Sequence, residues 1–165
     1  MLSPARIIIG VSAALLLAGC TAAPATPRPV VTASAISSNV FTMKVGDCLD
    51  DGASADGAGT VTRVPIVKCG VSHDSEVIAS VLLKGASSAF PGSDAVENSA
   101  DQKCNAPYEK FTGATLRTTR LDYTYYFPSA ASWKQGDRQV LCVVYDPHGP
   151  VTGTLRGKGS SYPKS

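Results

Sequence analysis

Charged residues are scarce in this chain, and neither sign dominates. Asp, Glu, Lys and Arg make up 17% of the 165 residues, against about 25% in an average soluble protein, and the net charge is +2. No basic run occurs, which excludes the clustered basic face of a nucleic-acid-binding protein. The 15 glycines and 11 prolines are too few for a low-complexity disordered chain. Internal repeats are absent too, so the length predicts one ordinary domain.

The apolar run near the N-terminus is too short to span a membrane. It extends over 11 residues, from Ile7 to Leu17, whereas a spanning helix needs about 20. Arg6 precedes it and small residues follow it, which is typical of a secretory signal. Its end, Leu17-Ala18-Gly19-Cys20, resembles the bacterial lipoprotein signal, in which the cysteine receives a diacylglycerol and cleavage occurs just before it; the alternative is an ordinary signal with an incidental cysteine. We expect a signal peptide over residues 1–19 and a lipid on Cys20, whose two acyl chains would hold the protein on the extracytoplasmic face of the cell membrane.

A segment with little apolar bulk follows the predicted lipid site. Residues 20–40 contain three prolines, one charged residue and many small or hydroxylated residues. Such a segment buries too little surface to offset the entropy of ordering it, so it predicts a flexible tether. The composition changes at Phe41, and we expect a single domain over residues 41–158 and a disordered tail over 159–165.

The domain is predicted to have an α+β fold, a small antiparallel sheet with one main helix and two disulfides. Apolar patterns predict strands over residues 41–45, 60–67, 75–83, 118–127, 138–145 and 152–155. Pro65 argues for an edge position or a bulge in the second of these strands. Asp94 and Glu97 have the spacing of a capping box, which predicts a helix that ends at Gly113. Pro107 should kink or divide that helix, and a short helical turn is expected over 129–134.

Four cysteines remain once Cys20 is assigned to the lipid, namely Cys48, Cys69, Cys104 and Cys142. An even number of cysteines in an exported domain points to disulfides, and no pair has the short spacing of common zinc sites. Four cysteines allow three pairings. We favour Cys48–Cys69, which would join the ends of the first two strands, and Cys104–Cys142, which would join the helix to the most strongly predicted strand.

Ser72-His73-Asp74 contains the residue types of a hydrolase triad, but consecutive residues of an extended chain point to opposite sides. We therefore favour local hydrogen bonding for His73 and Asp74. Metal binding has little support, because His148 is the only other histidine and Asp50, Asp51 and Asp56 lack the spacing of a calcium loop. A solvated loop is the better interpretation of those three carboxylates. Neither a metal nor another cofactor is expected.

Aromatic residues gather in the second half of the domain. Tyr123, Tyr125 and Phe127 alternate, which predicts the core face of a strand. Tyr126 lies on the other face of that strand. Together with Trp133 it remains open as part of a shallow groove for a glycan, a peptide or a protein, because Tyr and Trp are common in binding surfaces.

Several short segments form an ordered set within residues 41–158. They are Val45-Gly46-Asp47-Cys48, Val64-Pro65 before Cys69, His73-Asp74-Ser75-Glu76-Val77, Ala89-Phe90-Pro91-Gly92, Cys104, Ser132-Trp133-Lys134-Gln135-Gly136-Asp137-Arg138 before Cys142, and Thr152-Gly153-Thr154-Leu155-Arg156-Gly157. Together they resemble the septum-formation domain family, found mainly in actinobacterial envelope proteins. Ser72 stands where this family usually has a proline.

The resemblance implies an extracytoplasmic domain at the membrane with a proposed role in septum formation, and it supplies no established catalytic residue. It also suggests structural roles for Asp137 and Arg138 at a hairpin turn and for Trp133 in the core. Our first hypothesis is a non-enzymatic scaffold lipoprotein that is bound to the membrane through Cys20 and contacts an envelope or division protein. The alternatives are a lipoprotein that binds a cell-wall glycan or peptide and, with least support, a hydrolase that uses His73 and Asp74.

Overall fold

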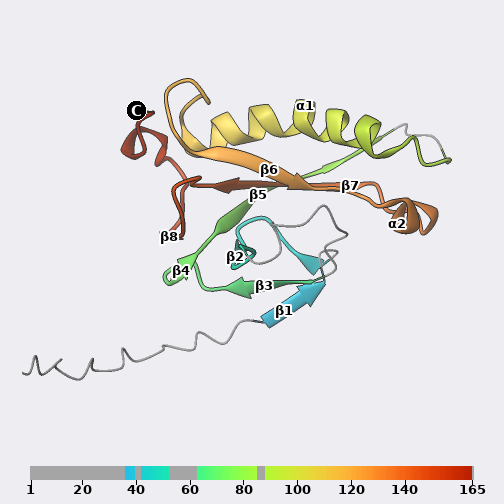
Figure 1. Ribbon diagram of the computed structural model, residues 1–165, viewed down its shortest axis with the longest axis horizontal. Helices are drawn as coiled ribbons and strands as arrows, with labels where there is room; N and C mark the ends of the chain where they lie inside the picture. The colour runs from blue at the N-terminus through green and yellow to red at the C-terminus, as the bar shows by residue number, and fades with distance from the viewer. Residues whose placement is uncertain (1–35, 40–41, 53–62, 85–87, 165) are drawn as a thin grey trace, which may run out of the picture. The chain divides into compact units, whose positions relative to one another are not determined.

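The main sheet has six antiparallel strands and is seen in a computed structural model that describes residues 36–39, 42–52, 63–84 and 88–164. The strand order is β1-β3-β2-β5-β7-β6. One long helix, α1 (Ser93–Thr112), lies along the β5, β7 and β6 part of this sheet (Figure 1). The α+β prediction is therefore confirmed. Within the described residues, no helix has the length and apolar character needed to cross a bilayer.

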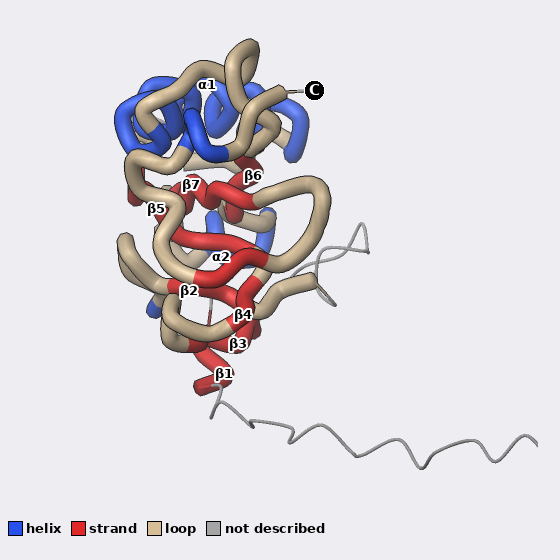
Figure 2. The backbone as a smooth tube through the Cα atoms, turned by 90° about the vertical axis from the view of Figure 1, so that its left-hand side faces the viewer, coloured by secondary structure: helices blue, strands red, loops and turns tan. Residues whose placement is uncertain are grey.

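The strands of the main sheet are short except at its centre. Their bounds are β1 Ile36–Asn39, β2 Cys48–Leu49, β3 Arg63–Val67, β5 Ser75–Leu82, β6 Asp122–Tyr126 and β7 Gln139–Tyr145. A second sheet pairs β4 (Ser72–His73) with β8 (Val151–Thr152). The remaining elements are the short helix α2 (Ala130–Lys134) and the 3-10 helix η2 (Gly159–Ser161), and Figure 2 shows the sheet beneath α1 from the side.

The strand β7 is buried on both faces, as its continuous apolar sequence predicts. Val140, Cys142 and Val144 face the core under α1, whereas Leu141 and Val143 face a second core on the other side of the sheet. Because side chains alternate along a strand, one central strand serves both cores.

The helix α1 presents one buried face to the sheet, with apolar residues three or four positions apart from Val96 to Phe111. The predicted capping box is wrong, because the N-cap residue is Gly92 and no side chain caps the helix. The predicted division at Pro107 is also wrong, since α1 is one helix through that residue. The buried residues Cys104 and Tyr108 on either side of Pro107 hold this part of the helix to the core. The predicted end at Gly113 is confirmed by its left-handed φ of 72°.

Two strand predictions also differ from the structure. The strand expected over 41–45 is absent from the described residues of that range, because the Asp47 carboxylate accepts a hydrogen bond from Lys44 N and closes a turn. Phe41 lies outside the described residues. Pro65 is not at a sheet edge, since β3 has β1 on one side and β2 on the other. Only Ile66 and Val67 of β3 pair with β2, so Pro65, which has no N–H, lies just beyond the paired residues on that side.

The expected boundaries of the domain change at both ends. Residues 36–39, predicted as the end of the tether, form β1 and pair with β3, and residues 1–35 lie outside the described part. The predicted disordered tail is instead packed against the domain as far as Lys164. Its Tyr162 carbonyl accepts hydrogen bonds from Thr119 Oγ1 and from Arg120 N, and the Arg120 guanidinium lies over the Tyr162 ring. These contacts come from residues more than 40 positions earlier, so the composition of the tail does not reveal them.

Candidate functional site

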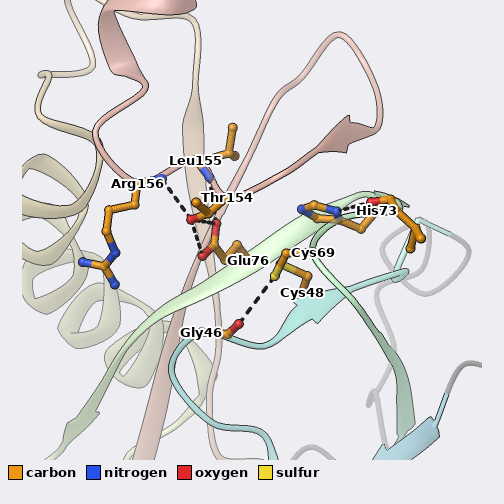
Figure 3. The surroundings of a disulfide bond; sticks show 9 residues. Gly46, Cys48, Cys69, His73, Glu76, Thr154, Leu155 and Arg156 are labelled. Carbon is orange, nitrogen blue, oxygen red and sulfur yellow. Dashed lines mark hydrogen bonds between the residues drawn. A yellow bond between two sulfur atoms is a disulfide. The ribbon is translucent and has the colours of Figure 1, made fainter.

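Both predicted disulfides are present, Cys48–Cys69 and Cys104–Cys142, and the second joins α1 to β7. The two sulfur atoms of Cys48–Cys69 and a Glu76 carboxylate oxygen lie within 4.8 Å of one another (Figure 3). The sulfurs are bonded to each other, and the buried Glu76 carboxylate accepts hydrogen bonds from Thr154 Oγ1 and Leu155 N. In the oxidised protein, Cys48, Cys69 and Glu76 therefore make structural contacts and do not form an open set of metal ligands.

Trp133 does not line a surface groove, because its side chain is only 2% exposed. The Arg138 guanidinium lies 3.7 Å from the centre of the indole ring and donates a hydrogen bond to the Trp133 carbonyl. The Phe90 ring meets the indole edge-on at 5.7 Å. The possible binding role of Trp133 is therefore wrong on grounds of access, and its interpretation as a core residue is confirmed.

Tyr126 points to a buried carboxylate instead of an open groove. Its hydroxyl donates to Asp51 Oδ2 at 2.5 Å, and Ser75 Oγ lies 2.9 Å from both Asp51 carboxylate oxygens. Asp51 is 6% exposed, so the prediction of a solvated loop is wrong for this residue, while Asp56 lies outside the described residues. Burial, followed by the hydrogen bond to Asp51, raises the pKa of Tyr126 above its usual value.

His73 and Asp74 make separate structural contacts. The His73 imidazole is 1% exposed, its Nδ1 lies 2.8 Å from the Val71 carbonyl, and its Nε2 has no partner in the described part of the chain (Figure 3). Asp74 accepts a hydrogen bond from Gly52 N at 2.7 Å. The predicted local contact is therefore wrong for Asp74, because Gly52 lies 22 positions away in the sequence. Burial, followed by the adjacent Asp74 carboxylate, raises the pKa of Asp50. His73 therefore belongs to a buried turn, whereas Asp74 holds the loop that contains Gly52.

The described part of the molecule has an open cavity of about 410 Å³ between α1 and β6. Three carboxylates contribute to its lining, Glu97 and Asp101 from α1 and Asp122 from β6. The other lining residues are Leu116, Tyr123, Thr124, Tyr125 and Phe127. None of the described residues that line it is a lysine or an arginine. The cavity therefore combines negative charge with aromatic walls.

The carboxylates of the cavity affect the hydrogen bonding and the pKa values of its tyrosines. Tyr123 donates a hydrogen bond from its hydroxyl to Asp101 Oδ1 at 2.8 Å. Burial, together with this hydrogen bond, raises the pKa of Tyr123 to about 12. Burial, followed by the charges of Asp101 and Glu97, also raises the pKa of Tyr125. Both phenols are therefore neutral at physiological pH and the three carboxylates set the sign of the local field.

Sequence reasoning missed this cavity, although part of its signal was present. Glu97 and Asp101 are four positions apart and so lie on one face of a helix. Tyr123 and Tyr125 were assigned to the core face of their strand, and they do pack against the core under α1. The sequence contains no signal for the position of α1 over β6, which brings these two pairs together. The predicted lipid site, Cys20, lies outside the described residues.

The comparison with protein families matches most of the domain. A family model described as septum formation matches residues 45–161, which is more than two thirds of the chain. The matched range contains both disulfides, α1 and the cavity. Searches of curated proteins and of solved structures gave no match.

Proposed function

The chain belongs to the septum-formation family. We propose that it acts as a lipid-anchored, extracytoplasmic domain that binds a partner without catalysing a reaction. The family description itself supports a role in septum formation. The anchor and the non-enzymatic binding role are the finer parts of the proposal. Each of them has its own support and its own test.

The support for the anchor is the N-terminal sequence. Arg6, the apolar run from Ile7 to Leu17 and the residues up to Cys20 resemble a lipoprotein signal as a unit. One acyl chain binds a membrane only marginally, whereas two chains give stable attachment. The tether between Cys20 and β1 would then keep the domain at the membrane while leaving its surface free to meet a partner.

The observation that carries the binding role is the open cavity at the outer strand of the sheet, with its three carboxylates and aromatic walls. By contrast, the two residues of the hydrolase hypothesis have structural contacts. His73 is buried, and Asp74 accepts a hydrogen bond from the backbone of Gly52. Binding is therefore the role that the geometry supports best.

The second candidate is a lipoprotein that binds a cell-wall glycan or peptide. Its site would differ from the one expected from sequence, because Trp133 is buried and Tyr126 bonds to Asp51. The aromatic residues of the α1/β6 cavity favour this function instead.

Fractionation of cells that express the full chain tests the anchor. We expect Cys20→Ala to be released into the medium or to remain unprocessed, and Thr26→Ala, a change within the tether, to behave as wild type. The same cells test the role in septation, since wild-type chain should restore normal septum spacing after depletion of the protein and Cys20→Ala should not. Recovery of Cys20→Ala in the membrane fraction in its normal processed form would contradict the anchor.

Asp74→Asn separates binding from hydrolysis. Asparagine retains an oxygen that can accept the hydrogen bond from Gly52 N, but it cannot act as the acid of a hydrolase. We expect Asp74→Asn to restore septum spacing as well as wild type does. Loss of function in this variant, with an unchanged denaturant midpoint, would favour the enzyme.

A further inference from the structure

The outer edge of β6 is open in the described part of the chain. β6 pairs with β7 on one side only and ends the strand order. Backbone groups of an antiparallel strand alternate in direction, and Tyr123 N donates to Asp122 Oδ1, so it points away from β7. Tyr125, two positions further, presents its backbone groups to the same side. The Tyr123 N–H is occupied by the Asp122 carboxylate, so the groups that remain for another extended chain are the Tyr123 carbonyl and the N–H and carbonyl of Tyr125.

The carboxylates of the cavity follow this open edge. α1 runs alongside β6 (Figure 1) and contributes Glu97 and Asp101, whose side chains are exposed. Four residues of an α-helix span about 6 Å. Two residues of a β-strand span about 6.8 Å. The spacing of the two carboxylates therefore matches the distance between side chains i and i+2 of an added strand, which point to the same face.

The remaining walls of the cavity suit a cation with an aliphatic stem. Tyr123, Tyr125 and Phe127 contact the core on the face of the sheet that α1 covers. Aromatic rings bind the methylene groups and the charged end of lysine or arginine. The described lining residues include no basic side chain that would neutralise the three carboxylates.

We propose that an extended peptide with basic residues at positions i and i+2 binds as an additional strand along β6, with its two cations beside Glu97 and Asp101. This inference rests on the proposed binding role and names the chemistry of the partner. The backbone of β6 would supply hydrogen bonds that are independent of sequence. The cavity would supply the preference for basic residues on alternate positions.

Binding of short synthetic peptides to the full chain in detergent micelles, with its disulfides intact, tests the proposal by fluorescence anisotropy. One peptide carries Lys at positions i and i+2 in a Thr/Val background, and a second of equal composition carries Lys at i and i+3. Side chains at i and i+3 point to opposite faces, so we expect the second peptide to bind at least about 10-fold more weakly. A third peptide has the i, i+2 pattern and carries N-methyl groups on every second amide. It is made in two versions, which are methylated on the two alternative sets of amides. The version that is methylated on the amides facing β6 should lose binding, and the other version should keep it.

Charge variants of α1 provide a matched comparison. Glu97→Gln and Asp101→Asn should each weaken binding of the i, i+2 peptide by about 3- to 10-fold, whereas Glu109→Gln, an exposed change of equal charge outside the cavity, should leave it unchanged. Asn at 101 can still accept the hydrogen bond from Tyr123, and an unchanged denaturant midpoint will verify folding.

Three results would overturn the proposal. The first is equal affinity for the two lysine patterns. The second is binding that depends on charge but is lost with neither of the N-methylated versions. The third is a Glu97→Gln variant that binds the i, i+2 peptide no more weakly than the Glu109→Gln variant does. A concentration-dependent dimer that excludes the peptide would assign the edge to a second copy of this chain instead. If wild type restores septum spacing and Cys20→Ala does not, the proposed function stands even where the peptide fails to bind.

Discussion

The hydrogen bond between Tyr126 and the buried Asp51 carboxylate offers a sharp test of the second core. Tyr126→Phe removes the hydroxyl that lies 2.5 Å from Asp51 Oδ2 and leaves the ring in place. Ser75 has one hydroxyl proton, so it can give Asp51 only one of the donors that the carboxylate needs. A hydrogen bond to a charged group contributes about 1.5–3 kcal/mol, and we expect Tyr126→Phe to lower the free energy of unfolding by that amount.

Urea unfolding of the oxidised protein measures this effect, followed by circular dichroism at neutral pH. Tyr125→Phe is the matched control, because it removes a hydroxyl from the adjacent residue of the same strand, where no described hydrogen bond depends on it. We expect the control to change the free energy of unfolding by less than about 0.5 kcal/mol.

A double-mutant cycle with Asp51→Ala isolates the interaction itself. Residues in direct hydrogen-bonded contact give interaction energies of about 0.5–3 kcal/mol, and we expect a value above about 1 kcal/mol for Tyr126 and Asp51. An interaction energy within about 0.3 kcal/mol of zero, or equal losses for Tyr126→Phe and Tyr125→Phe, would refute the reasoning.

Three further predictions concern packing, pH and cross-linking. Gly159→Ala would place its Cβ in steric conflict with the Cβ of Ala114, so we expect the free energy of unfolding in urea to fall by about 1–3 kcal/mol, whereas Gly70→Ala, with nothing within 4 Å of the added Cβ, should be neutral. Burial raises the pKa values of Tyr108 and Tyr123 to about 12; the native state then holds these protons more tightly than the unfolded state, so stability is retained below about pH 10 and should fall as pH rises from there towards 12. Replacing both cysteines of Cys104–Cys142 by alanine should lower the free energy of unfolding by about 4 kcal/mol for a 38-residue separation, as measured against the oxidised wild type.

Local patterns predicted those elements whose own residues have a clear apolar period or end signal. The continuous apolar residues of β7, the helical spacing before Gly113 and the short helix α2 all follow from the order of residues over one segment. The strand expected at 41–45 shows the limit of this approach. Its alternation is real, but the Asp47 side chain makes a turn with Lys44 N that the alternation does not encode.

Sequence patterns predict the burial of apolar residues better than that of polar ones. Asp51 lies in a loop of small and acidic residues and reads as solvated, yet the hydroxyls of Ser75 and Tyr126 compensate its burial. Tyr126 lies 75 positions away from Asp51, and composition carries no information about such a pair. The same holds for the tail, where Thr119 and Arg120 bind the Tyr162 carbonyl.

The order of residues by itself determined the α+β class and the family, because these depend on periodicity and short motifs, whereas it only favoured one of three cysteine pairings, which the structure then confirmed. Only the tertiary structure decided which polar groups are buried and where the sheet ends. The cavity between α1 and β6 is the main example, since it combines one helix turn with one strand that lies more than 20 positions further along the chain. Long-range packing sets that distance, and a polar side chain becomes either a structural contact or part of a binding surface according to what the fold places beside it.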